Sequence, residues 1–382
     1  MDKKSICFVA TLGHTLDTFL VKQTSYLIAD GWEVHWACGG VPTKHPDGVI
    51  CHQLTLNRMP SFLTAFGSFF ILLRLFLINR FDVIQYCTPM ASLIASIAGL
   101  IARTPIRIYA QWGLRYVSLA GIEKKLLKSA EKTTCFLSSV IQPDSFGNLK
   151  FSVNEGLYFK HKGSVIGNGS AIGIDTKYYD ILQVKHYASK AYKRLCINKK
   201  SFVFGYVGSV RKDKGCNELI KAFQLAFPEY QSNEKLLIIG DHDFATELEK
   251  EVLDALKYDQ RIVCIGPIKD IRPFLAITDC FVFPSYREGF GMSIIEAASL
   301  GVPAIVSDIP GPNEAIQNYK TGILVPVRDV DSLLNALKYV RENPKDLKKM
   351  GKEAIKHVLK KYDSHNLMKA FIENKNKLIK GK

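Results

Sequence analysis

The chain has 382 residues, of which 47% are hydrophobic and 23% charged, and these are ordinary values for globular domains. The composition excludes a disordered chain and a collagen-like or coiled-coil fibre, and the length predicts two or three domains. The formal net charge of +15 favours anionic partners, such as phosphorylated substrates or an anionic membrane surface. We expect no nucleic-acid partner, because no zinc-finger spacing, RNP motif or aromatic-basic stripe accompanies the charge.

Cysteines and apolar runs limit the cellular setting. The nine cysteines form no C-x-x-C pair, which is typical of buried thiols in a reducing compartment. The start MDKKSICFVATLG is too short in apolar residues for a signal peptide and predicts a first strand. The longest apolar stretch, Ser61–Ile78, contains Arg74, whereas a transmembrane helix needs about 20 apolar residues. It remains open whether this stretch is a core helix or lies on a membrane surface.

The first half of the chain alternates short apolar β-branched segments with helical patterns. Strands are predicted at Ile6–Ala10, Val34–Cys38, Val83–Cys87, Ile106–Ala110 and Thr134–Ser138. Helices are predicted between them, at Thr18–Asp30, Ser61–Ile78, Ser92–Arg103 and Ile122–Glu131. A stretch with turn chemistry and no obvious strand, Gly167–Ala188, predicts the seam between two domains.

A second series of the same kind fills the rest of the chain. Its predicted strands are Phe202–Val207, Lys235–Ile239, Ile262–Ile265, Cys280–Pro284, Ala304–Val306 and Gly322–Val325. Its predicted helices are Cys216–Phe227, Phe244–Leu256, Met292–Leu300 and Asp331–Val340, followed by helix alone over Pro344–Lys382. Strand–helix alternation requires parallel sheets covered on both faces. The sequence therefore predicts an α/β protein with two doubly wound, Rossmann-like domains facing across a cleft.

The segment FVFPSYREGFGMSIIE at Phe281–Glu296 carries the most chemistry. A buried strand ends at Pro284, a polar loop with glycines follows, and a helix begins near Met292. Glycines let a ligand approach the backbone closely, and a helix N-terminus suits phosphate. Glu288 in the loop and Glu296 on the helix are suited to sugar hydroxyls, since hydrogen bonds to charged acceptors are strong.

This segment resembles a known family. EGFGMSIIE, with seven residues between Glu288 and Glu296, is similar to the E-x7-E motif of retaining GT-B glycosyltransferases, family 4 or "glycosyltransferase group 1". The flanking EAASLGVPAIVSDIPGPNEAI and TGILVP agree with it. The first half resembles capsule and O-antigen members of that family at YAQWGLRY, IEKKLLK and SVIGNGSAIGID.

The resemblance implies a donor site in the second half of the chain. Glu296 is expected to hydrogen-bond the ribose of the donor nucleotide. Glu288 and the backbone after it are expected to hold the donor sugar and diphosphate, through Gly289, Phe290, Gly291, Met292 and Ser293. Gly266 is expected to border the base.

The resemblance also implies a basic diphosphate-binding loop after the first strand of the second domain. That loop is Gly208–Gly215, where Lys214 matches the family lysine and Ser209 stands at the usual arginine position. Arg211 or Lys212 is then expected to replace the arginine, because the leaving diphosphate develops negative charge. We assign catalysis to Glu288, Lys214 and Arg211, and donor contacts to Gly208 and Ser209 as well.

The family places its acceptor side in the first domain. The place of the family histidine matches Gln111-Trp112-Gly113, which contains no histidine and so departs from the family. The expected acceptor side is Gly13, Gln111 and Arg115. Asp241-His242-Asp243 fits an Asp-x-Asp metal motif formally, yet the resemblance implies no metal and no cofactor, so we read it as a polar loop.

The prediction is a retaining, hexosyl-type glycosyltransferase that moves a sugar from a nucleotide-sugar, UDP-linked, to a lipid-diphosphate-linked saccharide of a bacterial surface polysaccharide. The resemblance implies an acceptor domain at 1–180, a nucleotide-sugar domain at 195–362, and a helix over about 363–382 that packs back on the first domain. It also implies a cytoplasmic enzyme, peripheral on the inner leaflet of the bacterial inner membrane. Two alternatives stay open: a sugar-nucleotide epimerase of the same fold, and a catalytically silent sugar-nucleotide-binding module.

Overall fold

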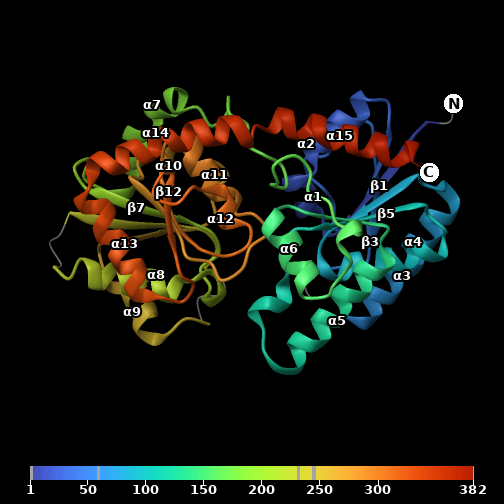
Figure 1. Ribbon diagram of the computed structural model, residues 1–382, viewed down its shortest axis with the longest axis horizontal. Coiled ribbons are helices and arrows are strands. Elements are labelled where there is room, and N and C mark those ends of the chain that lie inside the picture. Colours follow the sequence, from blue (N-terminus) through green and yellow to red (C-terminus); the bar gives the residue numbers. More distant parts are fainter. Residues whose placement is uncertain (1–2, 58–60, 230–232, 243–246, 382) are drawn as a thin grey trace. The chain divides into compact units, whose positions relative to one another are not determined.

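The computed structural model describes residues 3–57, 61–229, 233–242 and 247–381 (Figure 1). The chain divides into two compact units. The N-terminal unit comprises Met1–Gly173 together with Ser364–Lys382, and the C-terminal unit comprises Ile174–Asp363. Each unit is built on one parallel sheet.

The sheet of the N-terminal unit has six parallel strands in the order β3-β2-β1-β4-β5-β6. The strands are β1 (Ser5–Leu12), β2 (Glu33–Gly39), β3 (Val49–Leu54), β4 (Val83–Tyr86), β5 (Ile106–Gln111) and β6 (Val140–Pro143). Successive side chains of β1 pack on opposite faces: Cys7 and Val9 join one core, Phe8 and Ala10 the other. Both faces are therefore buried, as parallel sheets require.

Helices cover both faces of this sheet (Figure 1). One core includes Leu72 of α3, Ile94 of α4 and Cys135 of α5, and the other includes Leu27 of α2 and Phe371 of α15. The helical elements are α1 (Gly13–Phe19), α2 (Val21–Ala29), α3 (Phe62–Asn79), α4 (Pro89–Ile101), η1 (Arg115–Ser118), α5 (Gly121–Leu137), α6 (Phe146–Asn154), η2 (Lys160–Lys162) and α15 (Ser364–Lys380).

The sheet of the C-terminal unit also has six parallel strands, in the order β12-β11-β10-β7-β8-β9. The strands are β7 (Phe202–Val207), β8 (Glu234–Ile239), β9 (Ile262–Ile265), β10 (Cys280–Phe283), β11 (Ala304–Ser307) and β12 (Gly322–Val325). Counted from each unit's first strand, both sheets have the order 3-2-1-4-5-6 of dinucleotide-binding folds. The prediction of two doubly wound α/β sheets is confirmed.

Helices again cover both faces of the C-terminal sheet. Phe204 packs with Leu219 of α8 and Leu333 of α13, whereas Val203 packs with Ala191 of α7 and Phe274 of α10. The helical elements are α7 (Ile181–Leu195), η3 (Lys212–Lys214), α8 (Cys216–Ala226), α9 (Lys250–Tyr258), α10 (Arg272–Leu275), α11 (Met292–Ser299), α12 (Pro312–Ala315), α13 (Val330–Glu342) and α14 (Pro344–Lys361).

One predicted strand is wrong. The predicted strand Thr134–Ser138 continues α5, because the hydroxyls of Thr133 and Thr134 donate to the carbonyls of Ser129 and Ala130 one turn earlier. Such bonds satisfy β-branched hydroxyls inside a helix. The strand at this place is β6, two residues farther on.

Some elements were not predicted because they lack a clear sequence pattern. Strand β3 was not predicted, because this edge strand is mostly exposed and lacks a continuous apolar run. Helix α7 was missed within the predicted seam, although its apolar side chains Val184 and Ala191 are buried. The predicted helix Thr18–Asp30 is two helices, and the predicted helix Phe244–Leu256 begins in residues outside the described part of the chain.

Helix α3 exposes most of its apolar surface. Among the described residues it is the one helix long and apolar enough to cross a membrane, yet only 22% of it is buried in the structure. Leu72, Leu75 and Phe76 face the core, whereas Phe62 is 82% exposed and Leu63 79% exposed. The helix is therefore only in part a core helix.

Candidate functional site

The C-terminal unit brings two of the expected donor loops to one point of its sheet. Strands β7 and β10 are neighbours, and the strand order reverses between them. The loop Gly208–Gly215 follows β7, and the loop Pro284–Gly291 follows β10. Ligands of open α/β sheets bind at such a reversal, outside the carboxyl ends of the strands. We take the residues of these two loops as the candidate donor site.

The two loops are joined by an ion pair between Lys214 and Glu288, two of the three residues expected to act in catalysis. Both side chains are largely buried, and the hydroxyl of Ser285 donates to the same Glu288 carboxylate over 3.2 Å. An ammonium group and a carboxylate therefore lie side by side at the reversal of the strand order. A diphosphate would offer the Lys214 ammonium a second anion, and a sugar hydroxyl would offer Glu288 a donor.

A second pair of contacts extends this cluster and includes a residue that the sequence did not single out. Arg287 Nη2 lies 2.8 Å from Asp213 Oδ2, and Arg211 Nε lies 3.3 Å from Asp213 Oδ1. Asp213 therefore links Arg211 of the first loop to Arg287 of the second. Arg287 directly precedes Glu288 in the motif, and this adjacency is the signal that could have found it.

Three cations, Arg211, Lys214 and Arg287, thus meet two carboxylates, Asp213 and Glu288. The cluster carries a net positive charge, so it suits an anionic ligand. We name these five residues the charged cluster.

Glycine lets the two loops approach each other. Gly215 has a φ of 71°, and a Cβ there would lie 2.1 Å from the carbonyl oxygen of Pro284. A Cβ on Gly240, after β8, would lie 2.0 Å from the carbonyl oxygen of Gly208. A side chain at either position would push the basic loop away from its neighbour.

The N-terminus of α11 lies directly after the charged cluster. Gly291, with a φ of 87°, precedes the helix and supplies no capping side chain. Met292 and Ser293 form the first turn, while Gly289 and Phe290 are buried just before it. The backbone N–H groups and the positive dipole end of this first turn suit a phosphate or a sugar oxygen.

Glu296 lies one turn farther along α11 and outside the charged cluster. Its carboxylate accepts a hydrogen bond from the hydroxyl of Tyr179. Burial raises the pKa of Glu296 above its usual range, and this hydrogen bond opposes the shift. The Tyr179 contact was not predicted, because Tyr179 lies in the segment read only as a seam. The structure thus holds Glu288 and Glu296 by different partners.

The remaining donor residues are placed less distinctively. Ser209 carries the carbonyl that accepts a hydrogen bond from the hydroxyl of Tyr206 over 2.8 Å, which fixes the backbone of the basic loop. Gly266 follows β9 and is exposed, and a Cβ there would meet nothing within 4 Å. No contact within the C-terminal unit therefore requires a glycine at this position.

The three expected acceptor residues all belong to the N-terminal unit but differ in exposure. Gly13 begins α1, and a Cβ there would lie 3.0 Å from the backbone nitrogen of Pro42. Gln111 ends β5 and is fully buried, with its amide donating to Glu131 over 2.7 Å. Arg115 on η1 is exposed. Gly13 and Gln111 are both buried, so Arg115 is the one of the three that is open to a ligand.

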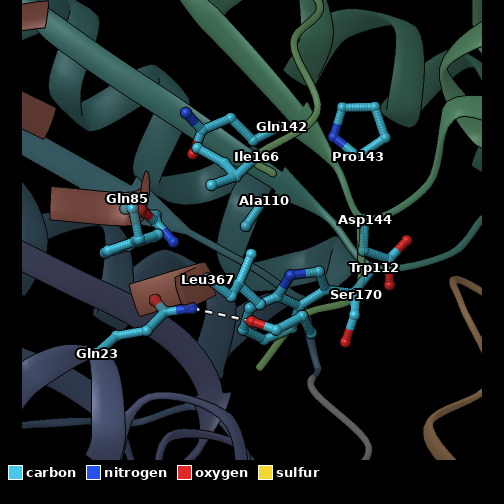
Figure 2. Close-up of a pocket in the computed structure, with 12 residues that line it drawn as sticks. Gln23, Gln85, Ala110, Trp112, Gln142, Pro143, Asp144, Ile166, Ser170 and Leu367 are labelled. Atoms are coloured by element: carbon cyan, nitrogen blue, oxygen red, sulfur yellow. Dashed lines mark hydrogen bonds between the residues drawn. The ribbon is translucent and has the colours of Figure 1, made fainter. Parts of the chain in front are cut away.

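A small polar cavity on the α15 face of the N-terminal sheet is shown in Figure 2. Gln23, Gln85 and Gln142 line it, and Gln23 donates to the carbonyl of Ala171 over 3.0 Å. Its volume of about 30 Å³ has room for one ordered water. This cavity is too small for a sugar or a nucleotide.

A buried lysine contacts Gln142 on the wall of this cavity. Lys375 of α15 is fully buried and donates to Gln142 Oε1 over 2.9 Å. Burial holds the pKa of Lys375 well below its usual range.

A metal site is not formed by the described residues, in which no group of three His, Cys, Asp or Glu side chains converges. In the Asp241-His242-Asp243 segment, Asp243 lies outside the described residues.

Comparisons with known proteins agree with the geometry of the C-terminal unit. Residues 189–357 match the family model "Glycosyl transferases group 1". The capsular polysaccharide biosynthesis glycosyltransferase CapM of Staphylococcus aureus is 29% identical over 90% of this chain and 89% of its own length. An Escherichia coli enzyme described as UDP-Gal:alpha-D-GlcNAc-diphosphoundecaprenol alpha-1,3-galactosyltransferase is 26% identical over 76% of this chain and 74% of its own.

Solved structures share the fold of the whole chain. A sucrose-phosphate synthase from Thermosynechococcus elongatus matches with a TM-score of 0.81 at 18% identity, covering 100% of both chains. Anabaena HepE in complex with UDP matches with a TM-score of 0.76 at 18% identity, covering 98% of this chain and 100% of the other. At this identity the likeness shows the GT-B fold alone.

Proposed function

We propose that this chain, a GT-B glycosyltransferase whose residues 189–357 match the group 1 family, transfers a hexosyl unit from a UDP-sugar to a lipid-diphosphate-linked saccharide with retention of the anomeric configuration. The product would extend a bacterial surface polysaccharide. The observation that carries this proposal is the charged cluster at the reversal of the C-terminal strand order.

The donor diphosphate is assigned to this cluster because the cluster carries an excess of positive charge next to a helix N-terminus. Lys214 and Arg211 bind the diphosphate, and the first turn of α11 adds backbone donors. Ionised Glu296 accepts hydrogen bonds from the ribose hydroxyls. UDP is favoured as the nucleotide because the Escherichia coli relative is named for a UDP-sugar.

The chemical step has a simple balance. The bond between the sugar C1 and the leaving phosphate oxygen breaks, and the acceptor oxygen bonds to C1 on the same face. The proton of the acceptor hydroxyl moves to the leaving phosphate. Lys214 and Arg211 stabilise the charge that develops on that phosphate. Cations held in place before the reaction stabilise such charge without reorganising. No metal and no further cofactor enter the step as we propose it.

The test is transfer from UDP-hexoses to a short-chain lipid-diphosphate N-acetylglucosamine, read as UDP release and as the anomeric coupling of the product. An α-linked product from a UDP-α-hexose supports the proposal. An inverted anomer would overturn retention, and epimerised UDP-sugar without transfer would replace the transferase by an epimerase. If a nucleotide-sugar binds and nothing turns over with any acceptor, the chain is a silent binding module.

The proposed lipid-linked acceptor also calls for contact with a membrane, and α3 supplies a fitting surface. Its exposed side chains Phe62, Leu63, Phe66 and Phe70 would enter the lipid, and the cytoplasmic leaflet of the bacterial inner membrane would supply anionic headgroups. A chain of net charge +15 is attracted to such headgroups at about 1 kcal/mol per nearby cation. The protein is then peripheral on the inner leaflet.

Sedimentation with vesicles tests this contact. Wild type should sediment with vesicles containing phosphatidylglycerol and much less with pure phosphatidylcholine vesicles. The double variant Phe62→Ser with Phe66→Ser should lose binding, while Phe159→Ser, which changes an equally exposed phenylalanine outside α3, should keep it. Equal sedimentation of both variants would contradict a membrane role for α3.

A further inference from the structure

A second cavity of the N-terminal unit lies where ligands of α/β sheets bind. Its volume is about 310 Å³, and Thr11 at the end of β1 lies on its wall with Pro89 and Met90 at the start of α4. Strands β1 and β4 are the neighbours between which the N-terminal strand order reverses. The cavity therefore occupies the position that the charged cluster occupies in the C-terminal unit.

The connection that shapes this cavity is held in a strained conformation. Thr88, between β4 and α4, has a φ of 70° although it is not a glycine. Its hydroxyl accepts a hydrogen bond from the backbone N–H of Thr11 over 3.0 Å and lies 2.7 Å from the Thr11 hydroxyl. Such strain costs about 1–3 kcal/mol and persists only where the surroundings enforce it. These bonds fix the start of α4 on the cavity wall.

One wall of the cavity carries a buried carboxylate, that of Glu131 on α5. The hydroxyl of Tyr109 donates to its Oε2 over 3.0 Å, and the amide of Gln111 donates to its Oε1 over 2.7 Å. Burial raises the pKa of Glu131 above its usual range, and the two hydrogen bonds oppose that shift. An ionised carboxylate offers about four acceptor positions, so two hydroxyl donors of a ligand would complete it.

The orientation of this carboxylate is fixed by a chain of buried groups. Gln111 Oε1 accepts from the hydroxyls of Ser152 over 2.9 Å and Tyr158 over 3.4 Å, which turns its amide nitrogen toward Glu131. Gln111 is therefore a positioning residue rather than a ligand contact. A polar group held in place before binding loses little entropy when a substrate arrives.

The other walls differ in character. Met90, Leu93 and Leu127 supply apolar surface, and Arg115 supplies a guanidinium that pairs with no carboxylate among the described residues. The cavity thus combines a hydroxyl-binding carboxylate, a cation and an apolar wall. A saccharide joined through a phosphate to a hydrocarbon chain matches all three.

We propose that this cavity is the acceptor subsite, in which Glu131 accepts hydrogen bonds from acceptor sugar hydroxyls, Arg115 pairs with the acceptor phosphate, and Met90, Leu93 and Leu127 contact the start of the lipid. This inference rests on the proposed function and deepens it. It assigns Glu131 as the residue that selects a hydroxylated acceptor.

The test measures binding and turnover separately. Farnesyl-diphosphate-linked N-acetylglucosamine is titrated into the full chain without nucleotide, and UDP is titrated in a second series. Glu131→Gln keeps the shape of the side chain but removes its charge, so the Kd of the farnesyl probe should rise about tenfold or more. Leu93→Trp should block the cavity without touching Glu131, and Arg115→Gln, at an exposed position, should weaken the probe about threefold to tenfold.

The matched control is Glu123→Gln, the same chemical change on an exposed residue of the same helix. It should leave probe binding unchanged. UDP binding should stay within about twofold of wild type in all four variants, which shows that the C-terminal unit is intact. A cooperative thermal melt shows that the N-terminal unit of each variant folds.

The outcomes separate this inference from the proposed function. Unchanged probe binding in both Glu131→Gln and Leu93→Trp would overturn the acceptor subsite, even where wild type transfers sugar. Loss of probe binding in these variants supports the subsite, even where no UDP-sugar is turned over and the proposed function fails. Failure of the wild type to bind the probe would overturn the subsite directly.

Discussion

The two units share one backbone plan but carry different chemistry at the same position of that plan. In the C-terminal unit the reversal of strand order carries Arg211, Lys214 and Arg287 against Asp213 and Glu288. In the N-terminal unit the same position is a cavity with apolar walls, one buried carboxylate and one exposed cation. The fold therefore fixes where a ligand binds, and the loops decide which ligand it is.

The units also differ in the partners of their buried basic side chains. The cations of the charged cluster lie beside carboxylates, whereas Lys375 of the N-terminal unit has an amide as its partner and packs over the ring of Phe371 at 4.3 Å. Paired charges near a site are available to a ligand, and an unpaired buried amine is a cost to stability. The predictions below break or sharpen this contrast.

The largest effect is expected for Lys214→Met. This change removes the cation that pairs with Glu288 and would bind the diphosphate, so kcat/KM should fall about 100-fold to 1,000-fold. Lys338→Met, which removes an exposed lysine of α13, should leave kcat/KM near the wild-type value. A Lys214→Met enzyme with more than a third of wild-type kcat/KM would refute the role of the cluster.

A smaller loss is expected for Arg287→Gln. It frees Asp213 to bind Arg211 alone and lowers the positive charge of the cluster, so the Kd of UDP should rise about tenfold. Arg287→Lys keeps the charge but not the planar guanidinium. Its Kd for UDP should lie between the values of wild type and Arg287→Gln. UDP titrations measure both, and identical Kd values for Arg287→Gln and wild type would remove Arg287 from the site.

Glu296 should give UDP binding an acid limb. Because burial raises the pKa of this carboxyl, the ionised form that binds ribose is lost at a higher pH than for an ordinary glutamate. UDP affinity of the wild type should therefore fall as the pH falls through that raised pKa. Glu296→Gln should bind UDP about tenfold more weakly at neutral pH and show no such limb.

The contribution of Glu296 to folding stability depends on pH in the opposite direction to its contribution to UDP binding. A carboxyl with a raised folded-state pKa stabilises the fold at low pH and loses that contribution as the pH rises through the raised pKa. Glu296→Gln should therefore not lower the melting temperature at neutral pH. A clear drop there would show that the charge of Glu296 supports the fold rather than a ligand.

The smallest effect concerns Lys375, far from any proposed ligand. A lysine whose folded-state pKa is depressed contributes stability above its unfolded pKa and loses it as the pH falls. Lys375→Met should therefore melt at a higher temperature than wild type at neutral pH, with the difference shrinking toward strongly basic pH. A less stable Lys375→Met at neutral pH would mean that the bond to Gln142 outweighs the burial of the charge.

Sequence reasoning reached the architecture and the donor loops because both are local patterns. The strands β7 and β10 are short apolar runs, and the loops after them carry glycines and charges at fixed spacing. The resemblance implied donor-binding roles for Lys214 and Glu288 separately, but the ion pair between these residues, 74 positions apart, was not predicted. The assignment of roles to these residues stays a prediction until the variants are measured.

The other site residues could not be predicted from the sequence because their contacts depend on tertiary packing. Glu131 lies on a helix whose end, Thr134–Ser138, has the composition of a strand, so its burial beside a cavity could not be read from the pattern. Arg287 and Tyr179 act through partners distant in sequence, Asp213 and Glu296. Gln111 shows the converse, because the family resemblance suggested a ligand contact there and tertiary packing buries its side chain.

The central claim is that Lys214 binds the β-phosphate of a uridine nucleotide at the charged cluster. The most direct measurement is calorimetric titration of UDP and of UMP into wild type and Lys214→Met. Wild type should bind UDP at least about tenfold more tightly than UMP, and Lys214→Met should bind the two almost equally, because the missing cation served only the β-phosphate. A Lys214→Met protein that keeps the full preference for UDP, or a wild type that binds neither nucleotide, would contradict the account.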